Sequence, residues 1–351
     1  MVCNQRPGMI DWLLELGAAR VARPVLRGGG GSDATSLPNQ IVVCRLGISV
    51  VGERAPLARG DGNLAVRSSR ECRGGRMNRN VRILRKAIRL VYGHRTIAIP
   101  GEGAARLRIP PAEYPSLCLG VWRFEPRIKQ RWKALLAPGE IIFDIGANIG
   151  ITVQRFHALL SGACVIYAFE PLPRNVALLR KNSAVLHGRI QVIEVAVGNT
   201  DGHIHFEDNL DHGALSRMSS LGTPSQQDRD FWQHSSSIEV QLVTLDRYCT
   251  YNPEAMPTFI KLDVEGAGHW VMQGAQSTLS QYKPVVSCSF HGQEEQEGIL
   301  EVLASQGYRG IQVDAGGTLS WCGLAESEGE FGHPDCARIA SRIKAAVLAS
   351  S

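Results

Sequence analysis

The sequence predicts an α/β protein built on an open, mostly parallel sheet with helices on both faces. Two observations favour this class. Residues 141–150, IIFDIGANIG, begin as an apolar run and become a glycine-containing bend, and the segment that follows, ITVQRFHALL, reads as a helix. Strand-like and helix-like segments then alternate regularly from residue 140 onwards. Strands of a parallel sheet are buried on both faces, which gives short continuous apolar runs of this kind.

The alternation assigns each element of the expected sheet. The expected strands span 141–145, 164–169, 190–196, 258–263 and 284–290. The expected helices span 150–160, 174–187, 266–281 and 293–306. A sheet of this type binds ligands at the carboxyl ends of its strands, here the first and the fourth.

A β-rich insertion separates the third and fourth strands. It contains HIHFED at 203–208 and IEVQLVTL at 238–245, and its polar middle reads as a loop that could cover the pocket. Near the C-terminus, GIQVD and TLSW flank an AGG turn, which predicts a terminal antiparallel hairpin.

The N-terminal part differs in composition from the rest. Residues 1–140 hold 24 Lys and Arg against 10 Asp and Glu, whereas the remainder holds 14 against 23. Residues 1–76 contain GGGGS and many arginines, which is typical of a low-complexity, disordered segment or of a mis-assigned start ahead of Met77. We therefore divide the chain into 1–76, a basic helical or lid segment at 77–139, a catalytic domain at 140–325 and a C-terminal helix or tail at 326–351.

The basic segment begins with NRNVRILRKAIRLVYGH, which has apolar residues at helical spacing and basic residues between them. This pattern is typical of a helix packed beside the sheet with a solvated basic face. It also permits weak contact with an anionic membrane surface or with phosphates. Further on, Trp122, Phe124 and Trp132 could line a substrate wall or seat the segment on the core.

The bend after the first strand has the features of a ligand loop. Gly146 and Gly150 bracket Asn148, so the position of the middle glycine of a dinucleotide motif carries a side chain. Asp144 stands two residues before Gly146, where a carboxylate suits a cationic ligand better than a pyrophosphate. S-adenosylmethionine carries an ammonium and a sulfonium group, so these four residues predict its methionine end.

Three further residues are expected around the rest of this cofactor. Glu170 ends the second strand 24 positions after Gly146, where an acid can accept hydrogen bonds from ribose hydroxyls. Asn182 and the backbone of Ala196 are candidates beside adenine. Asn182 can equally well cap or pack its own helix.

Acids and a histidine follow the fourth and fifth strands. Asp263 and Glu265 leave the fourth strand, where one is expected to cap the helix that starts at Gly266 and the other to face the pocket as a base. His291 ends the fifth strand and is the other candidate base. Lys261, within the fourth strand, is expected to be structural or paired to a neighbouring acid.

The stretches FDIGANIG, AFEPLPRNVALLRKN, VAVGNTDG, TLDRY and IKLDVEGAGHWVMQGA resemble the FkbM family of S-adenosylmethionine-dependent methyltransferases in order and spacing, over roughly residues 140–310. One departure is Gly268, at a place where the family pattern usually has an acid. The resemblance implies the Rossmann-like, seven-stranded class I methyltransferase sheet. It also implies methylation, which we expect on a hydroxyl of a small-molecule, sugar or glycan acceptor or of a natural product.

Other functions have less support. Methylation of RNA is the first alternative, but no RNA-reading motif accompanies the basic helix, and nucleic acid is not an expected partner. A non-catalytic binding module is the second, but it would not need Asp144, Gly146 and Glu170 together. A metal cluster of His203, His205, Asp208, Asp211 and His212 was weighed against an ordinary exposed strand, and no metal is expected. Nine cysteines without a C-x-x-C pair favour a reducing, cytoplasmic location.

Overall fold

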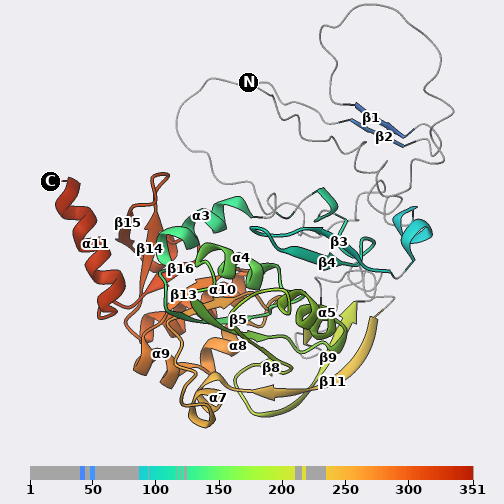
Figure 1. Cartoon of the computed structure of the whole chain (residues 1–351). Helices are drawn as coiled ribbons and strands as arrows, with labels where there is room; N and C mark the ends of the chain where they lie inside the picture. The colour runs from blue at the N-terminus through green and yellow to red at the C-terminus, as the bar shows by residue number, and fades with distance from the viewer. Residues whose placement is uncertain are drawn as a thin grey trace, which may run out of the picture. The chain divides into compact units, whose positions relative to one another are not determined.

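The computed structural model describes residues 40–43, 48–51, 87–93, 95–115, 117–119, 121, 125–209, 216–218 and 235–350 (Figure 1). The chain forms two units, Met1–Gly93 and His94–Ser351. In the first unit, strands β1 (Gln40–Val43) and β2 (Ile48–Val51) pair as an antiparallel hairpin, and residues 87–92 are helical. Most of the low-complexity segment and the first half of the expected basic helix lie outside the described residues.

Within the described residues, the second unit is built on an eight-stranded sheet of order β15-β14-β16-β13-β12-β5-β6-β7. The parallel strands are β13 (Val285–Cys288), β12 (Phe259–Leu262), β5 (Glu140–Ile145), β6 (Cys164–Phe169) and β7 (Arg189–Ile193). Antiparallel pairing adds β16 (Glu330–Gly332), β14 (Arg309–Val313) and β15 (Leu319–Cys322).

Helices cover both faces of this sheet, because alternate side chains of its strands point to opposite sides. Phe143, Phe169 and Leu262 belong to the core of one face. Its helices are α7 (Leu245–Tyr251), α8 (Gly268–Gln273), α9 (Gln276–Tyr282) and α10 (Gln293–Ser305). Ile142 and Ile166 belong to the core of the other. Its helices are α3 (Pro126–Leu135), α4 (Ile151–Leu159), α5 (Pro173–Ser183) and α11 (Ala337–Ser350). Figure 1 shows α3 and α4 above the sheet and α7 and α9 below it.

The insertion forms a second sheet, of order β10-β9-β11-β8 in the described part of the chain. Its strands are β8 (Ala196–Val197), β9 (Gly202–Asn209), β10 (Ser216–Met218) and β11 (Ser235–Val243). Phe206 and Val240 of this sheet pack with Leu172 and Ala267, which follow β6 and β12. The second sheet therefore lies against the carboxyl edge of the first. The polar loop expected to cover the pocket spans 221–237; residues 221–234 lie outside the described residues, and 235–237 begin β11.

The α/β class and the mostly parallel sheet are confirmed, and three details differ from expectation. The sheet has eight described strands rather than seven, because the unpredicted strand β16 pairs between β13 and β14. The expected third strand ends at Ile193, and the chain then leaves the central sheet so that β8 pairs with β11. The short strand β16 extends the sheet past residue 325, since Phe331 pairs with Val286 and is fully buried.

The residues before β5 are fastened to the sheet by polar contacts. Strands β3 (Ile97–Pro100) and β4 (Arg106–Ile109) form a small antiparallel hairpin, followed by the short helix η3 (Leu117–Leu119) and by α3. The buried Glu102 accepts a hydrogen bond of 3.0 Å from the buried Arg155 of α4 and also pairs with Lys129 of α3. Trp132 packs in the core, which agrees with the alternative that it anchors this segment to the sheet. Trp122 and Phe124 lie outside the described residues.

None of the helices among the described residues is long and apolar enough to span a membrane.

Candidate active site

The carboxyl ends of four adjacent strands carry most of the expected site residues. The loop after β5 holds Gly146 and Asn148, Glu170 follows β6, Asp263 follows β12 and His291 follows β13. Because β6, β5, β12 and β13 are neighbours in the sheet, these side chains meet along one edge.

The loop after β5 is shaped by close backbone contacts. Gly146 has a positive φ of 78°, and a Cβ there would lie 2.0 Å from the Asp263 carbonyl oxygen. The N–H groups of Gly146 and Ala147 both donate to the Phe169 carbonyl at 3.0 Å. Asn148 also has a left-handed backbone, with φ 50°, which asparagine tolerates better than most residues. Glycine is therefore required at 146 by the approach of β12 as well as by any ligand.

Asp144, which the sequence predicts beside a cationic ligand, contacts groups of the protein in this structure. Its side chain is completely buried, accepts a hydrogen bond from Thr152 and lies 3.2 Å from the Lys261 ammonium. The cation that this carboxylate meets is thus supplied by the protein itself.

Lys261 of β12 contacts both the residues of β5 and its following loop and the acid that follows β12. Its Nζ donates to the Gly146 carbonyl at 3.0 Å and lies 3.2 Å from Asp144 and 3.6 Å from Asp263. Burial alone would lower the pKa of Lys261, but the negative charges of Asp144 and Asp263 outweigh it and raise that pKa. The lysine therefore stays charged, as the expected partner of neighbouring acids.

Glu170 is buried at the end of β6. Its carboxylate accepts hydrogen bonds from the Asn148 N–H at 2.9 Å and from the Leu172 N–H and the Asn175 amide at 3.1 Å. Burial raises the pKa of Glu170, although these hydrogen bonds oppose the shift. A carboxylate has about four acceptor positions, so three bonds leave room for one ligand hydroxyl.

Asn182 and Ala196, the predicted neighbours of adenine, both make contacts within the protein. The Asn182 amide donates to the Ile149 and Arg108 carbonyls at 2.7 and 3.0 Å and accepts from the Arg108 N–H at 2.7 Å. These hydrogen bonds connect α5 to β4 and to the loop after β5, which gives Asn182 a packing role. Ala196 is buried in the second sheet, where it pairs with Leu242.

Asp263, Glu265 and His291 form one cluster, as expected for the catalytic residues. The His291 Nε2 lies 2.7 Å from Asp263, and its Nδ1 lies 3.5 Å from Glu265. The three side chains are half-buried, so they remain reachable from solvent. The imidazole stands between two carboxyl groups that leave the same strand.

The three groups of the cluster differ in pKa and therefore in protonation state near neutral pH. Burial would raise the pKa of Asp263, but the Lys261 charge and the hydrogen bond with His291 lower it to about 2. Burial raises the pKa of Glu265 to about 7, with only partial opposition from the His291 charge. Burial would lower the pKa of His291, but the hydrogen bond to Asp263 and the Glu265 charge raise it to about 9. Near neutral pH, Glu265 is the group able to accept a proton.

Neither acid of this cluster caps the following helix, contrary to expectation. The Gly268 N–H at the start of α8 donates to the carboxylate of Glu295 at 2.7 Å, and the His291 N–H donates to its other oxygen at 2.7 Å. Glu295 belongs to α10 and is buried. A Cβ at Gly268 would lie 2.8 Å from Glu295 Oε1, so the glycine leaves room for this carboxylate.

The ligand atoms of the cluster lie within 4.8 Å of one another, close enough to hold a divalent ion, although no metal was expected. In this structure the positive charge between the two acids comes from His291. The other cluster weighed in the sequence does not assemble. His203 and His205 are exposed on β9, whereas Asp208 points to the opposite face and pairs with Arg174. Asp211 and His212 lie outside the described residues.

Two residues at this edge were missed by the sequence analysis. The Tyr114 hydroxyl donates a hydrogen bond to the Asn148 side chain. The Glu295 carboxylate accepts hydrogen bonds from the N–H of Gly268 and the N–H of His291. Neither stands in a motif, because each reaches the edge from an element distant in sequence.

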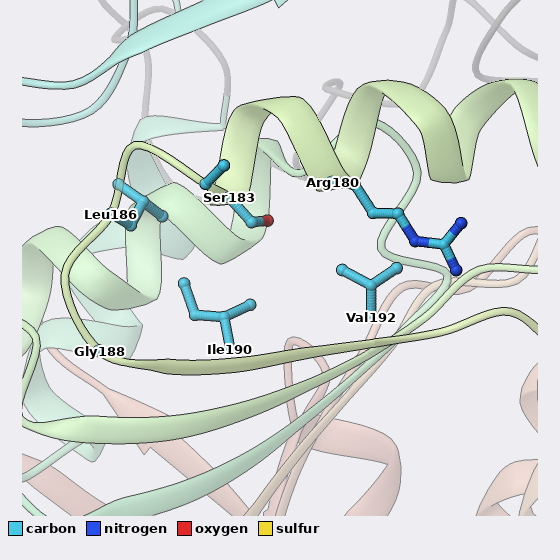
Figure 2. Close-up of a pocket in the computed structure, with 7 residues that line it drawn as sticks. Arg180, Ser183, Leu186, Gly188, Ile190 and Val192 are labelled. Atoms are coloured by element: carbon cyan, nitrogen blue, oxygen red, sulfur yellow. The ribbon is translucent and has the colours of Figure 1, made fainter.

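A separate hollow of about 380 Å³ lies between α5 and the edge strand β7 (Figure 2). In Figure 2, Arg180 and Ser183 extend from the helix, while Ile190 and Val192 rise from the strand. None of the expected site residues lines it. The chemistry predicted for this chain therefore belongs to the strand ends and not to this hollow.

Residues 144–309, which contain the loop, Glu170 and the catalytic cluster, match the family described as the methyltransferase FkbM domain. This region of the chain is therefore similar to the FkbM methyltransferases. The chain is 29% identical over 172 residues to the 2-O-methyltransferase NoeI of Sinorhizobium fredii, an alignment that covers 48% of this chain and 70% of that protein.

A second relative of the FkbM domain is the 31-O-demethyl-FK506 methyltransferase FkbM of Streptomyces tacrolimicus. It is 41% identical over 76 residues, which cover 21% of this chain and 28% of that protein. Among solved structures, a methyltransferase FkbM from Methylobacillus flagellatus is similar with a TM-score of 0.36 and 16% identity, over 62% of this chain and 54% of that chain.

Proposed function

We propose that the chain uses S-adenosylmethionine to methylate a hydroxyl group of a small molecule, such as a sugar or a natural product. The observation that carries the proposal is the position of Lys261. Its ammonium contacts the Gly146 carbonyl in the loop and lies 3.6 Å from Asp263 in the catalytic cluster. One buried side chain thereby joins the expected cofactor loop to the expected proton acceptors. Both named relatives support an oxygen acceptor.

The charged side chains at this edge fit S-adenosylmethionine. The charged groups are the carboxyls of Asp144, Glu170, Asp263 and Glu265 and the cations of Lys261 and His291. This excess of acids favours a cationic donor over a diphosphate. Glu170 retains an acceptor position for a ribose hydroxyl, and Gly146 and Asn148 present main chain on its methionine side. When bound, S-adenosylmethionine supplies a methyl group that its sulfonium makes electrophilic.

The cluster performs the remaining work, which is to orient a hydroxyl and remove its proton. Glu265 accepts the proton, because its pKa of about 7 matches the working pH. His291 remains an imidazolium, held by Asp263 at 2.7 Å, and stabilises the Glu265 carboxylate and the developing alkoxide. Asp263, with a pKa of about 2, stays ionised and fixes the imidazolium ring.

The test is methyl transfer from S-adenosylmethionine labelled with a heavy methyl group, measured by mass spectrometry on a panel of polyhydroxylated acceptors and on cell extracts. We expect an acceptor that gains one labelled methyl group on oxygen, with loss of transfer in Glu265→Gln. Labelling of nitrogen or carbon only, or of RNA in preference to small molecules, would refute the proposal.

A further inference from the structure

A segment outside the family match reaches the cofactor edge. Residues 110–114, PPAEY, follow β4 and precede the matched region 144–309. Tyr114 is only 6% exposed, and its hydroxyl donates to the Asn148 side-chain oxygen at 2.5 Å. Burial raises the pKa of Tyr114 well above its usual value, so the hydroxyl keeps its proton at any working pH. The tyrosine is therefore a permanent donor to the loop.

The acceptor of this bond, Asn148, links the tyrosine to Glu170. Asn148 has a left-handed backbone, and its side-chain oxygen also accepts from the Ile149 N–H at 2.7 Å. Its own N–H donates to Glu170 at 2.9 Å. The amide thus fixes the turn that aims one N–H at the carboxylate. The Tyr114 hydroxyl and the Ile149 N–H therefore donate to the same side-chain oxygen of Asn148.

Contacts on either side keep Tyr114 in place. The neighbouring Glu113 accepts from Arg174 of α5 at 2.6 Å, and Arg174 donates in turn to Asp208 of β9 at 2.5 Å. Earlier in the segment, Asn182 of α5 holds both backbone groups of Arg108. The tyrosine is fastened to the sheet independently of its own hydroxyl, so loss of that hydroxyl should leave the segment in position.

We propose that Tyr114 is a positioning residue for the cofactor: through its hydrogen bond to Asn148 it sets the loop conformation in which Glu170 can receive a ribose hydroxyl. The inference rests on the proposed function, since it takes Asn148 and Glu170 as residues that hold S-adenosylmethionine. Its specific content is that a residue outside the matched domain controls affinity for the cofactor and not the transfer step.

The experiment compares Tyr114→Phe with Tyr308→Phe by calorimetry with S-adenosylmethionine, thermal unfolding and steady-state kinetics. Tyr308 is the matched control, because its buried hydroxyl also makes one hydrogen bond, to the Pro284 carbonyl at 3.0 Å, remote from the loop. We expect Tyr114→Phe to raise the Kd and the KM for S-adenosylmethionine by about tenfold with kcat nearly unchanged. Tyr308→Phe should lower the Tm with affinity within about twofold of wild type.

Asn148→Gly supplies the second test. Glycine tolerates the left-handed backbone of this position, keeps the backbone N–H and removes the side-chain amide that Tyr114 contacts. Adding Tyr114→Phe to Asn148→Gly should cause no further loss of affinity, since both changes remove one interaction. Wild-type affinity in Tyr114→Phe, or fully additive losses in the double variant, would overturn the inference. A wild-type protein that binds no S-adenosylmethionine would instead refute the proposed function.

Discussion

The two halves of the carboxyl edge hold their charges in different ways. At β5 and β6, Asp144 and Glu170 are buried, and each is satisfied by groups of the protein. At β12 and β13, the side chains of Asp263 and Glu265 are 32% and 31% exposed and are held by His291. The half that we assign to the cofactor is thus buried, whereas the half that we assign to catalysis is open to solvent.

The largest effect should come from breaking the catalytic half alone. We expect Glu265→Gln to lower kcat by about 10²–10⁴-fold, the usual contribution of a positioned base, with little change in affinity for S-adenosylmethionine. In wild type, kcat/KM should rise with pH as Glu265 deprotonates near pH 7 and fall as His291 loses its proton near pH 9. The limb near pH 7 should vanish in the variant.

Steady-state kinetics against pH measure this effect, with Glu294→Gln as the control on an exposed acid of α10. Retention of the limb near pH 7 in Glu265→Gln would assign the base to another group.

Removal of Lys261, which contacts both halves of the edge, should lower the free energy of unfolding. Lys261→Met leaves Asp144 as a buried carboxylate without its cation, and we expect a loss of about 3–5 kcal/mol in the free energy of unfolding. Denaturant titration measures it. The double change Lys261→Met with Asp144→Asn should recover part of the loss, because no buried charge then remains. A single variant as stable as wild type would show that the ion pair is dispensable.

Breaking the cofactor half alone should have a smaller effect. Glu170→Ala removes the carboxylate that we assign to the ribose, and calorimetry should show S-adenosylmethionine binding weakened by about 1–3 kcal/mol. Transfer at saturating cofactor should be nearly unaffected, in contrast to Glu265→Gln. A large fall in kcat with unchanged affinity would reverse the roles of the two halves.

The smallest effect should follow metal removal. Although Asp263, Glu265 and His291 lie close enough to hold an ion, the imidazolium already balances the two acids. We expect exhaustive treatment with EDTA to change neither the methylation rate nor the Tm. Loss of activity that Mg²⁺ restores would show that the catalytic half is a metal site.

The sequence predicted those elements that are determined by a local pattern of neighbouring residues. The continuous apolar runs placed β5, β6, β12 and β13 to within two residues, and strand ends of a parallel sheet necessarily gather Asp263, Glu265 and His291. Strand β16 was missed because three residues carry too little periodicity to be detected. Its burial comes from Val286 and from β14, elements that no local pattern reveals.

The sequence does not reveal the contacts that distant parts of the chain make with predicted site residues. Asp144 has the position of a ligand acid, but Lys261, which lies over a hundred residues further along the chain, neutralises it. Asn182 has the position of an adenine contact, but the backbone of Arg108 satisfies it. Such pairs become visible only once the strands are in register.

The carboxylate of Glu295 binds one N–H from each of the two loops that carry the catalytic cluster. We therefore expect a displacement of either loop to move the other, which would keep the distance between Glu265 and His291 nearly constant.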